Sequence, residues 1–286
     1  MTKHARRRLL TFSHVFLLSC LSGWAANNAA PKMRTEELLA RHLASLGSAE
    51  AIAATKNRVL EGKVTAVFRV GQTGTVAGTA ALVSEGPQFG LSMIFQDFNY
   101  PAEKLVSNGK KVSVGMVEAG VRSPLSQFFH DYGHVLITEG LIGGTASVGW
   151  PLLSVKQRKA RLDYRGLKKV GGRELHELRY RAAKGDFSIA LYFEPDTFRH
   201  VRSQYELRMP SVDRDAREMR SDPDTIWTVT EEFADYKTVE GLTLPYSYQL
   251  RLNYDGLNRS FVGHWTFTFE EARQNLQLDG KTFAIE

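Results

Sequence analysis

Hydrophobic residues recur every three to four positions in the segment that begins near residue 35. Leu39, Leu43 and Leu46 have this spacing behind Thr35, whose hydroxyl can cap the first turn of a helix. A glycine follows, and Ser48 can cap a second short helix. The pattern predicts one helix from about residue 35 to 46 and a second that ends near residue 54.

From residue 59 onward the period changes to two. Apolar side chains alternate with polar ones over residues 59–95, 112–116, 161–209 and 225–269, and turn sequences such as Asn108-Gly109 separate the alternating runs. We predict about ten antiparallel strands, each with one apolar and one polar face. Because a twisted sheet of this size curls or splits, the expected architecture is a barrel, a half-barrel or a sandwich.

Residues 123–154 interrupt this alternation and are called the insertion below. Ser123-Pro124 is typical of a helix N-cap with proline in the first turn, and apolar residues then recur at helical spacing as far as Gly143-Gly144. We expect the insertion to cover the mouth of the sheet, either as a lid that moves about the two glycines or as a permanently docked cap. The predicted lid residues are Leu125, Phe128, Phe129, Leu136, Leu141 and Trp150.

The apolar face of the predicted sheet carries many large side chains. In one interpretation they fill a solid core; in the other they line a cavity for an apolar ligand, as in large barrels. Periodicity alone does not separate the two. The predicted lining residues are Phe68, Phe89, Leu91, Met93, Phe95, Phe187, Phe193, Trp227, Tyr248, Trp265 and Phe267.

The first 26 residues have the pattern of an export signal. Four basic residues precede an apolar run from Leu9 to Leu21, and small residues follow. The run is shorter than the roughly 20 residues that a membrane-spanning helix needs. We therefore predict a signal peptide over residues 1–26, export to the periplasm, and one domain over residues 27–286.

The lone cysteine, Cys20, lies inside this signal. The tetrapeptide LLSC that it ends resembles a bacterial lipobox, in which the cysteine is acylated and anchors the protein to a membrane. The alternative is cleavage near Ala25 or Ala26, which removes the cysteine with the signal. Either way no pair of cysteines remains, so the domain depends on its core and not on disulfides.

Composition adds little that points to a charged partner. The chain has 37 basic and 31 acidic residues, but four of the basic ones lie in the signal, so the remainder carries a net charge of only +2. We expect no nucleic-acid partner and a monomer. A local basic run fits either a solvated strand edge or a contact with anionic head groups. Its residues are Lys156, Arg158, Lys159, Arg161, Arg165, Lys168 and Lys169.

Catalytic signatures are weak. His130 and His134 are four residues apart, as in a zinc-binding helix, but the acid between them is aspartate, Gly133 weakens the helix and no third ligand is evident. His176 and His200 fall in strand segments and are expected at the surface. Serine-hydrolase and phosphate-loop motifs are absent from the sequence. We predict no enzyme, no cofactor and no bound metal, with a hydrolase or metal enzyme as the least favoured class.

Four segments together resemble the LolA/LolB-like superfamily of periplasmic outer-membrane lipoprotein-sorting proteins and lipid carriers. Glu37–Val64 resembles the family's amphipathic helix and first strand, and Leu167–Tyr180 its turn-centred hairpin. Tyr192–Leu207 resembles a strand–turn–strand motif in which Glu194 replaces the family's aspartate. Phe233–Tyr248, FADYKTVEGLTLPYSY, resembles a further strand pair.

The resemblance implies an incomplete antiparallel β-barrel of about ten to eleven strands, with an N-terminal helix and with the insertion closing an apolar cavity. It implies a carrier for acyl chains of lipids or lipoproteins, with inner- or outer-membrane envelope proteins as partners. Family carriers use an inner-face arginine to hold the lid, for which Arg69 is the candidate here. The alternative function is a structural or assembly factor of the envelope that keeps the fold without transport.

Overall fold

A computed structural model describes residues 33–70, 72–210, 224–256 and 259–285. The chain divides into two compact units, residues 1–32 and 33–286, and every described residue belongs to the second unit. The predicted signal peptide and Cys20 lie outside the described residues. Within the described part of the chain, no helix is long and apolar enough to cross a membrane.

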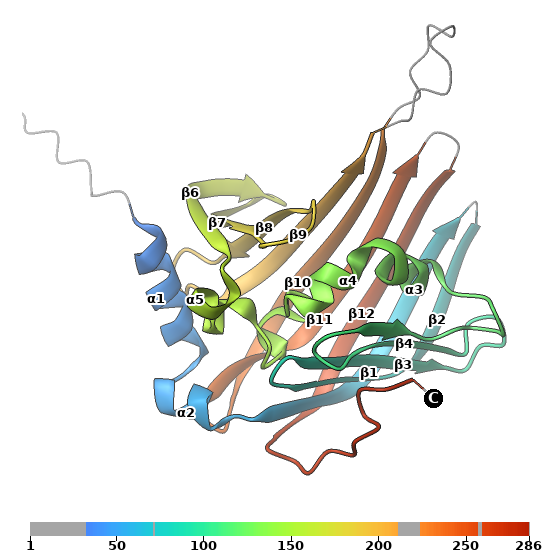
Figure 1. Cartoon of the computed structure of the whole chain (residues 1–286), viewed down its shortest axis with the longest axis horizontal. Coiled ribbons are helices and arrows are strands. Elements are labelled where there is room, and N and C mark those ends of the chain that lie inside the picture. The colour runs from blue at the N-terminus through green and yellow to red at the C-terminus, as the bar shows by residue number, and fades with distance from the viewer. Residues whose placement is uncertain (1–32, 71, 211–223, 257–258, 286) are drawn as a thin grey trace, which may run out of the picture. The chain divides into compact units, whose positions relative to one another are not determined.

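The described domain is built on one antiparallel sheet of twelve strands, in the order β5-β4-β3-β2-β1-β12-β11-β10-β9-β8-β7-β6 (Figure 1). The predicted fold class is confirmed, with one or two strands more than expected. The strands are β1 (Asn57–Val70), β2 (Gln72–Glu85), β3 (Gln88–Phe95), β4 (Ala102–Ser107), β5 (Val112–Val114), β6 (Arg161–Val170), β7 (Arg173–Arg181), β8 (Ser188–Phe193), β9 (His200–Met209), β10 (Thr225–Val239), β11 (Leu242–Gly256) and β12 (Arg259–Gln274).

Two meanders make up this sheet. Strands β1 to β5 precede the insertion and β6 to β12 follow it, and β1 pairs with β12, where Val64 lies opposite Phe267. Strands β5 and β6 therefore form the two edges of the described sheet, and the barrel is incomplete.

Strand β4 was not among the predicted strands. Its sequence, AEKLVS, does not read as an apolar alternation, because the inward-facing position 103 holds a glutamate. Glu103 is nevertheless buried, as are Leu105 and Ser107 on the same face. A carboxylate in an inward position thus hid the strand from pattern analysis.

The inner face carries a row of stacked aromatic rings across three neighbouring strands. Phe233, Tyr248 and Phe267 lie opposite one another in β10, β11 and β12. Their ring centroids are 5.2 Å apart for the first pair and 4.9 Å for the second, with interplanar angles of 14° and 21°. Such cross-strand pairs stabilise a sheet and fix its register.

The helices at the N-terminus are α1 (Thr35–Leu46) and α2 (Ala49–Ala54). Both agree with the prediction, and Ser48 Oγ accepts a hydrogen bond from the Ala51 amide at 3.1 Å. The buried face of α1 is shifted, however, from the leucines first expected. Leu38, His42 and Leu46 are buried, whereas Leu39 and Leu43 are only half-buried. The polar His42 concealed the true inward face.

The insertion consists of one helix with a π turn in its middle, followed by two short 3₁₀ turns. It contacts β4, β5, β9 and β11, and in Figure 1 it runs in front of β10 to β12. The helix is made of α3 (Pro124–Phe128), the π-helix η1 (Phe129–Gly133) and α4 (His134–Thr138), which follow one another without a break; the 3₁₀-helices are η2 (Gly144–Ala146) and η3 (Pro151–Leu153), and α5 (Val155–Arg158) begins directly after the insertion. The predicted cap at Ser123 is present, since Ser123 Oγ accepts from the Ser126 amide at 3.0 Å.

Candidate functional site

The insertion packs its apolar side chains against the inner face of the sheet. The six predicted lid residues, Leu125, Phe128, Phe129, Leu136, Leu141 and Trp150, are each at most 1% exposed. They belong to the same hydrophobic cluster as the inner-face residues of the sheet. In this state the insertion occupies space that a carrier would offer to a ligand.

The predicted lining residues all belong to that cluster. Eight of them are buried, and Phe68, Phe187 and Trp227 are partly buried. Phe128 of the insertion lies 5.2 Å from Trp227 and 6.3 Å from Phe187, measured between ring centroids. The structure thus brings lining and lid residues together, and their binding of a ligand remains a prediction.

Gly143 and Gly144 allow the insertion backbone to approach the sheet closely. Both have positive φ, at 83° and 48°. A Cβ atom on Gly144 would lie 2.6 Å from Phe233 Cζ, and one on Gly143 would lie 3.1 Å from Leu82 Cδ1. The glycines are therefore required for packing in the closed state, and their service as a hinge stays a prediction.

A buried carboxylate, Glu231 on β10, holds this part of the insertion. The residue is fully buried, and its carboxylate accepts hydrogen bonds from the Gly143 amide at 2.7 Å, Tyr205 Oη at 2.6 Å and Tyr248 Oη at 2.7 Å. Burial raises the pKa of Glu231 to about 7, although the three donors oppose that shift. Tyr205 Oη also lies 3.0 Å from the Leu141 carbonyl. We call this group the Glu231 site.

A second buried carboxylate, Glu103 on β4, holds the beginning of the insertion. It accepts from Tyr100 Oη at 2.6 Å, from Ser123 Oγ at 2.5 Å and from Ser126 Oγ. Burial raises the pKa of Glu103 above its usual range, against the effect of these hydroxyl donors. We call this group the Glu103 site.

A buried cation holds the middle of the insertion. Arg58 on β1 is 5% exposed, and its Nη1 donates to the carbonyl oxygens of Thr145 at 2.9 Å and Ala146 at 3.2 Å. Arg69, the residue that the family resemblance suggested, is exposed. The suggestion was wrong because Arg69 has the outward parity of β1, whereas Arg58 shares the inward parity of Leu60 and Val64.

Two buried histidines lie behind Trp150. Trp150 Nε1 donates to His42 Nε2 at 3.0 Å, and the other ring nitrogen of His42 is 3.1 Å from the Phe198 carbonyl. His200 lies 4.5 Å from the Trp150 ring, between centroids. Burial lowers the pKa of His42 to about 4 and that of His200 well below its usual range, so both are neutral at pH 7.

The expectation that His176 and His200 lie at the surface was wrong. They are 5% and 0% exposed, because both stand on inward-facing positions of the sheet.

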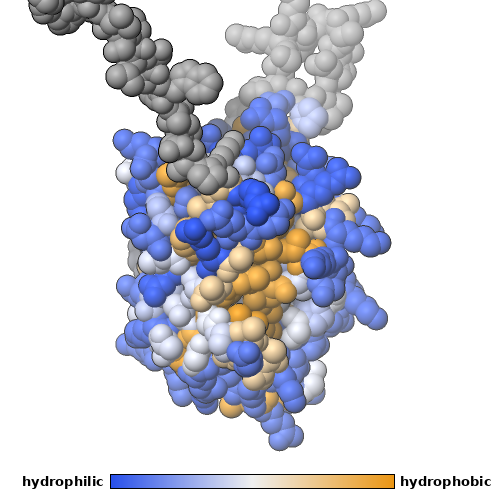
Figure 2. Space-filling view, turned by 90° about the vertical axis from the view of Figure 1, so that its left-hand side faces the viewer, coloured by the Kyte–Doolittle hydropathy of each residue, from blue (hydrophilic) through white to orange (hydrophobic). Residues whose placement is uncertain are grey.

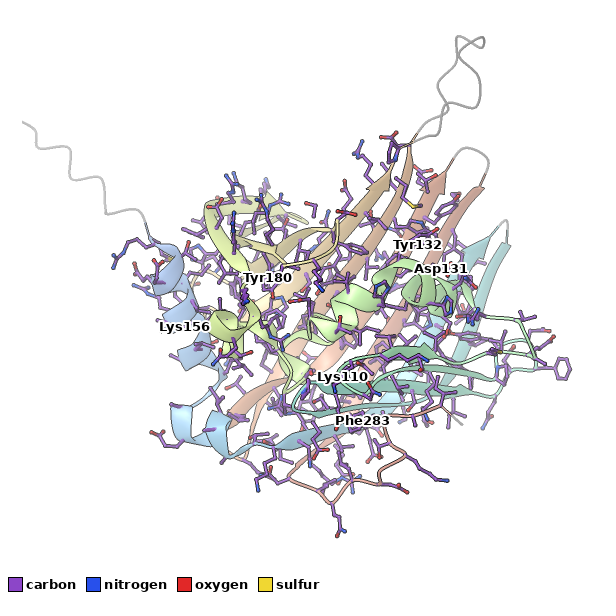
Figure 3. The ribbon with its side chains drawn as sticks, viewed as in Figure 1. Lys110, Asp131, Tyr132, Lys156, Tyr180 and Phe283 are labelled. Carbon is purple, nitrogen blue, oxygen red and sulfur yellow. The ribbon has the colours of Figure 1, made fainter. Side chains whose placement is uncertain are left out.

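Tyr180 on β7, labelled in Figure 3, makes a further contact with the insertion. Its hydroxyl donates to the Glu139 carboxylate at 2.9 Å.

The weaker sequence features remain at the periphery. His130 and His134 are exposed, and His130 Nδ1 lies 2.8 Å from Asp131 Oδ1. The described residues contain no group of three or more side chains that could hold a metal ion. In the basic run, Arg158 donates to the carbonyls of Glu139 and Gly149, whereas most of the other members are exposed.

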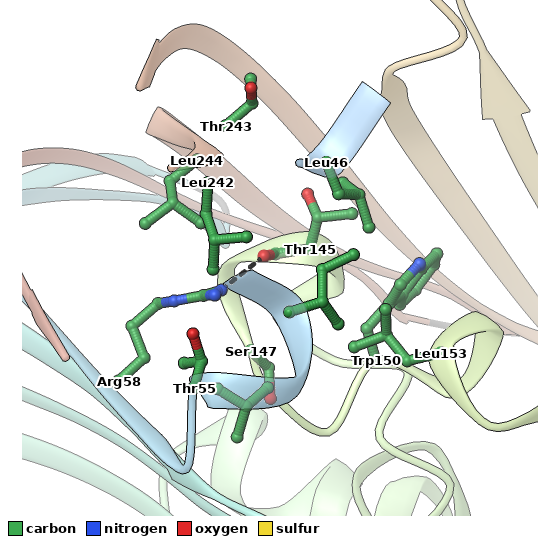
Figure 4. Close-up of a pocket in the computed structure, with 12 residues that line it drawn as sticks. Leu46, Thr55, Arg58, Thr145, Ser147, Trp150, Leu153, Leu242, Thr243 and Leu244 are labelled. Atoms are coloured by element: carbon green, nitrogen blue, oxygen red, sulfur yellow. Dashed lines mark hydrogen bonds between the residues drawn. The ribbon is translucent and has the colours of Figure 1, made fainter. Parts of the chain in front are cut away.

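A small pocket of about 50 Å³ opens between α2, the insertion and the start of β11 (Figure 4). We call it the Arg58 pocket. Its walls are mainly apolar, and Ile52, Leu153 and Thr243 on its rim are half-buried.

Figure 2 shows the side of the molecule that carries α1 in Figure 1, where an apolar band crosses the surface between polar margins. Apolar bands of this kind often mark binding surfaces.

Sequence analysis missed Glu231, Glu103 and Arg58. Each is a charged residue at an inward position of a strand that otherwise alternates. A charged residue at such a position marks a candidate buried polar contact in the sequence. A buried charge needs partners, and the most available ones here are the backbone and hydroxyl groups of the insertion.

Comparison with solved structures returns proteins of the superfamily that the motifs resemble. A LolA superfamily protein from Nitrosomonas europaea is 9% identical, with a TM-score of 0.47 over 88% of this chain and 98% of that one. An outer membrane lipoprotein-sorting protein domain from Vibrio parahaemolyticus is 10% identical, with a TM-score of 0.43 over 87% and 97%. A DUF1329 family protein from Desulfovibrio piger is 11% identical, with a TM-score of 0.38 over 87% and 96%.

No family model and no curated protein sequence matches the chain. The identities and TM-scores of the structural matches are low, so the argument for function below rests on the geometry of this chain.

Proposed function

We propose that the protein is a carrier that binds an acyl chain of a lipid or lipoprotein on the concave side of its sheet, after the insertion has moved aside. The observation that carries the proposal is the nature of the contacts that hold the insertion. Its apolar side chains fill the interior as a ligand would, and its backbone is held by a few polar side chains of the sheet, chiefly Glu231 and Arg58.

The second half of the insertion depends on the sheet for its structure. After the helix over residues 124–138 it contains only the three-residue turns η2 and η3. Isolated helices this short are not stable in water, so residues 139–154 keep their structure only because they pack on the sheet. A segment of this kind belongs to the low-stability end of a structure and opens more readily than the strands beneath it.

One acyl chain can replace the part of the insertion that follows residue 140. Its large buried apolar side chains are Leu141, Ile142, Trp150 and Leu152. On leaving the interior they lose about 1.5–3 kcal/mol each, or about 6–12 kcal/mol together. An acyl chain of about 14 methylenes gains about 0.8 kcal/mol for each one that it buries, or about 11 kcal/mol, which is of the same order.

The remaining parts of the proposal come from the sequence. The chain is exported by residues 1–26, and Cys20 is either acylated, which anchors the protein to a membrane, or removed with the signal. The eleven predicted lining residues would contact the acyl chain, and envelope proteins would deliver or accept it. No catalytic step is assigned.

A photoreactive fatty acid tests the proposal. A diazirine on the acyl chain should label inner-face residues such as Trp265 and Phe267, and an excess of unlabelled fatty acid should abolish the labelling. Hydrogen exchange should show faster exchange over residues 123–154 in the complex and unchanged exchange in β10 to β12. Labelling confined to outward-facing residues would contradict the carrier.

The filled interior favours a second candidate, an envelope structural or assembly factor. In that case the insertion is a permanent part of the core. Fatty acid would then leave its hydrogen exchange unchanged, and protein isolated from its own envelope would carry a partner protein and no lipid in native mass spectrometry.

A further inference from the structure

The Arg58 pocket combines apolar walls with one charged side chain. Of the described residues that line it, Arg58 alone is charged. The walls come from α1, α2, the insertion and β11, and they include Leu46, Ile52, Trp150, Leu153, Leu242 and Leu244. Figure 4 shows the guanidinium of Arg58 between these walls, directed at the Thr145 carbonyl.

No carboxylate among the described residues pairs with the guanidinium. Its only hydrogen bonds among the described residues go from Nη1 to two backbone carbonyls, and its buried Nε has no partner. Loss of hydration lowers the pKa of Arg58 to about 10, and no carboxylate raises it again. Arg58 is therefore a protonated, buried cation at neutral pH, an arrangement that costs free energy until an anion approaches.

The chemistry of the missing partner follows from the side chain and its surroundings. A guanidinium presents several N–H groups in one plane and binds carboxylate or phosphate through two of them at once. The apolar walls next to it match the first methylenes of an attached hydrocarbon chain. The pocket, at about 50 Å³, is small and suits a head group and not a whole chain.

We propose that Arg58 binds the anionic head group, a carboxylate or phosphate, of the acyl-chain ligand. This inference rests on the proposed carrier function and assigns the ligand's charge. The head group competes with the Thr145 and Ala146 carbonyls for the guanidinium, so its arrival weakens the hold on the middle of the insertion. Head-group binding and the release of the insertion then use the same side chain.

Three ligands with the same hydrocarbon chain test the proposal: dodecanoate, dodecyl phosphate and the neutral 1-dodecanol. Their affinities are measured by displacement of a neutral fluorescent probe. The wild-type protein should bind both anions at least about tenfold more tightly than the alcohol, since hydrogen bonds to a charged group are the stronger kind. Equal affinity for anions and alcohol in the wild type would overturn the proposal.

Substitutions at Arg58 and Arg69 show which side chain causes the preference for anions over the alcohol. Arg58→Gln should bind all three ligands with the affinity of the alcohol, and Arg58→Lys should keep only part of the preference. Arg69→Gln, on the exposed side of the same strand, is the matched control and should keep all of it. A preference that survives in folded Arg58→Gln would also overturn the proposal. If that variant does not fold, the comparison of wild type with Arg58→Lys decides, and an unchanged ratio counts against Arg58.

Two further outcomes distinguish an error in the lipid assignment from a failure of the carrier function. If inorganic phosphate displaces the probe as well as dodecyl phosphate does, the site binds a free anion and the lipid assignment is wrong. If neither the anions nor the alcohol bind, the carrier function fails and the inference fails with it. Binding of the alcohol without any preference for anions refutes the inference alone.

Discussion

The Glu103 and Glu231 sites are chemically alike, but they connect the insertion to very different parts of the chain. Both place a buried carboxylate among hydroxyl donors on the inner face of the sheet. Glu103 bonds to Ser123 and Ser126, which follow it closely in sequence. Glu231 bonds to Gly143, which lies 88 residues before it.

The length of chain that ties each contact to the sheet decides which one is more easily remade. Ser123 lies 9 residues beyond the end of β5, whereas Gly143 lies 18 residues before the start of β6, and closing the longer loop costs more conformational entropy. An insertion that opens as proposed would therefore pivot at the Glu103 site and detach at the Glu231 site, together with the bonds from Arg58. Four predictions separate the two sites.

The largest effect is expected for Glu231→Ala. The substitution leaves the Tyr248 hydroxyl and the Gly143 amide buried without their acceptor, at a cost of about 4 kcal/mol, whereas Tyr205 can still donate to the Leu141 carbonyl. Hydrogen exchange measured by mass spectrometry should accelerate over residues 141–150. Glu103→Ala should accelerate exchange around α3 instead, and the same pattern in both variants would refute the distinction.

Gly144→Ala should destabilise the protein by about 3 kcal/mol, because the new Cβ meets the Phe233 ring as well as an unfavourable φ. Gly86 has nearly the same φ, at 50°, and open space around it. Gly86→Ala is therefore the control for backbone strain alone, at about 1 kcal/mol. Denaturant unfolding of both variants gives the difference, and equal losses would contradict close packing at residue 144.

The contribution of Glu231 to stability should fall as pH rises from 5 to 8. Glu231 has a folded pKa of about 7 against 4.5 unfolded, so in this range the folded state binds the proton that the unfolded state has lost. The loss from this residue should be about 2–3 kcal/mol, complete just above pH 7.

Denaturant unfolding of the wild type and Glu231→Gln across the same pH range checks this origin, because the difference between the two proteins isolates the carboxylate. The buried His42 and His200 act in the opposite direction in both proteins: burial lowers their pKa values in the folded state, so below about pH 6.5 only the unfolded chain binds their protons. Tyr205 and Tyr248, which face Glu231, have pKa values raised above 10 and do not titrate in this range. Glu232→Gln, on the outward side of β10, is the control. A difference between the wild type and Glu231→Gln that does not change with pH would contradict the prediction.

The smallest effect is expected for Ser123→Ala. It removes the cap of α3 and one donor to Glu103, which should cost about 1 kcal/mol. The change should be confined to α3, with the Glu231 site unaffected in hydrogen exchange. A spread to residues 141–150 would show that the two ends of the insertion open together.

The apolar residues on the inner face of the sheet could be predicted from the sequence, because the alternation of apolar and polar side chains shows which residues share one face of a strand. Trp265, Phe267 and Tyr248 were placed on the inner face by spacing alone, and Ser123-Pro124 marked the start of α3. The twelve-stranded order could not be derived in this way, since the pairing of β1 with β12 leaves no local signature.

The buried polar residues that hold the insertion were not predicted, for a physical reason. Glu103, Glu231, Arg58 and His42 each stand on a buried face, where pattern analysis expects an apolar residue. Their burial is tolerable only because partners from distant segments supply hydrogen bonds. Information about those partners exists only in three dimensions, so the spacing predicted which side chains of the insertion are buried but did not identify what holds the insertion in place.

The pairing of β1 with β12 has a consequence for biogenesis. The first and last strands of the sheet-forming chain are neighbours at its centre, so the two meanders cannot join until the C-terminal residues are available. Long-range pairing of this kind makes folding slow. If the chain is exported as proposed, that delay would help it to stay unfolded until β12 has crossed the membrane.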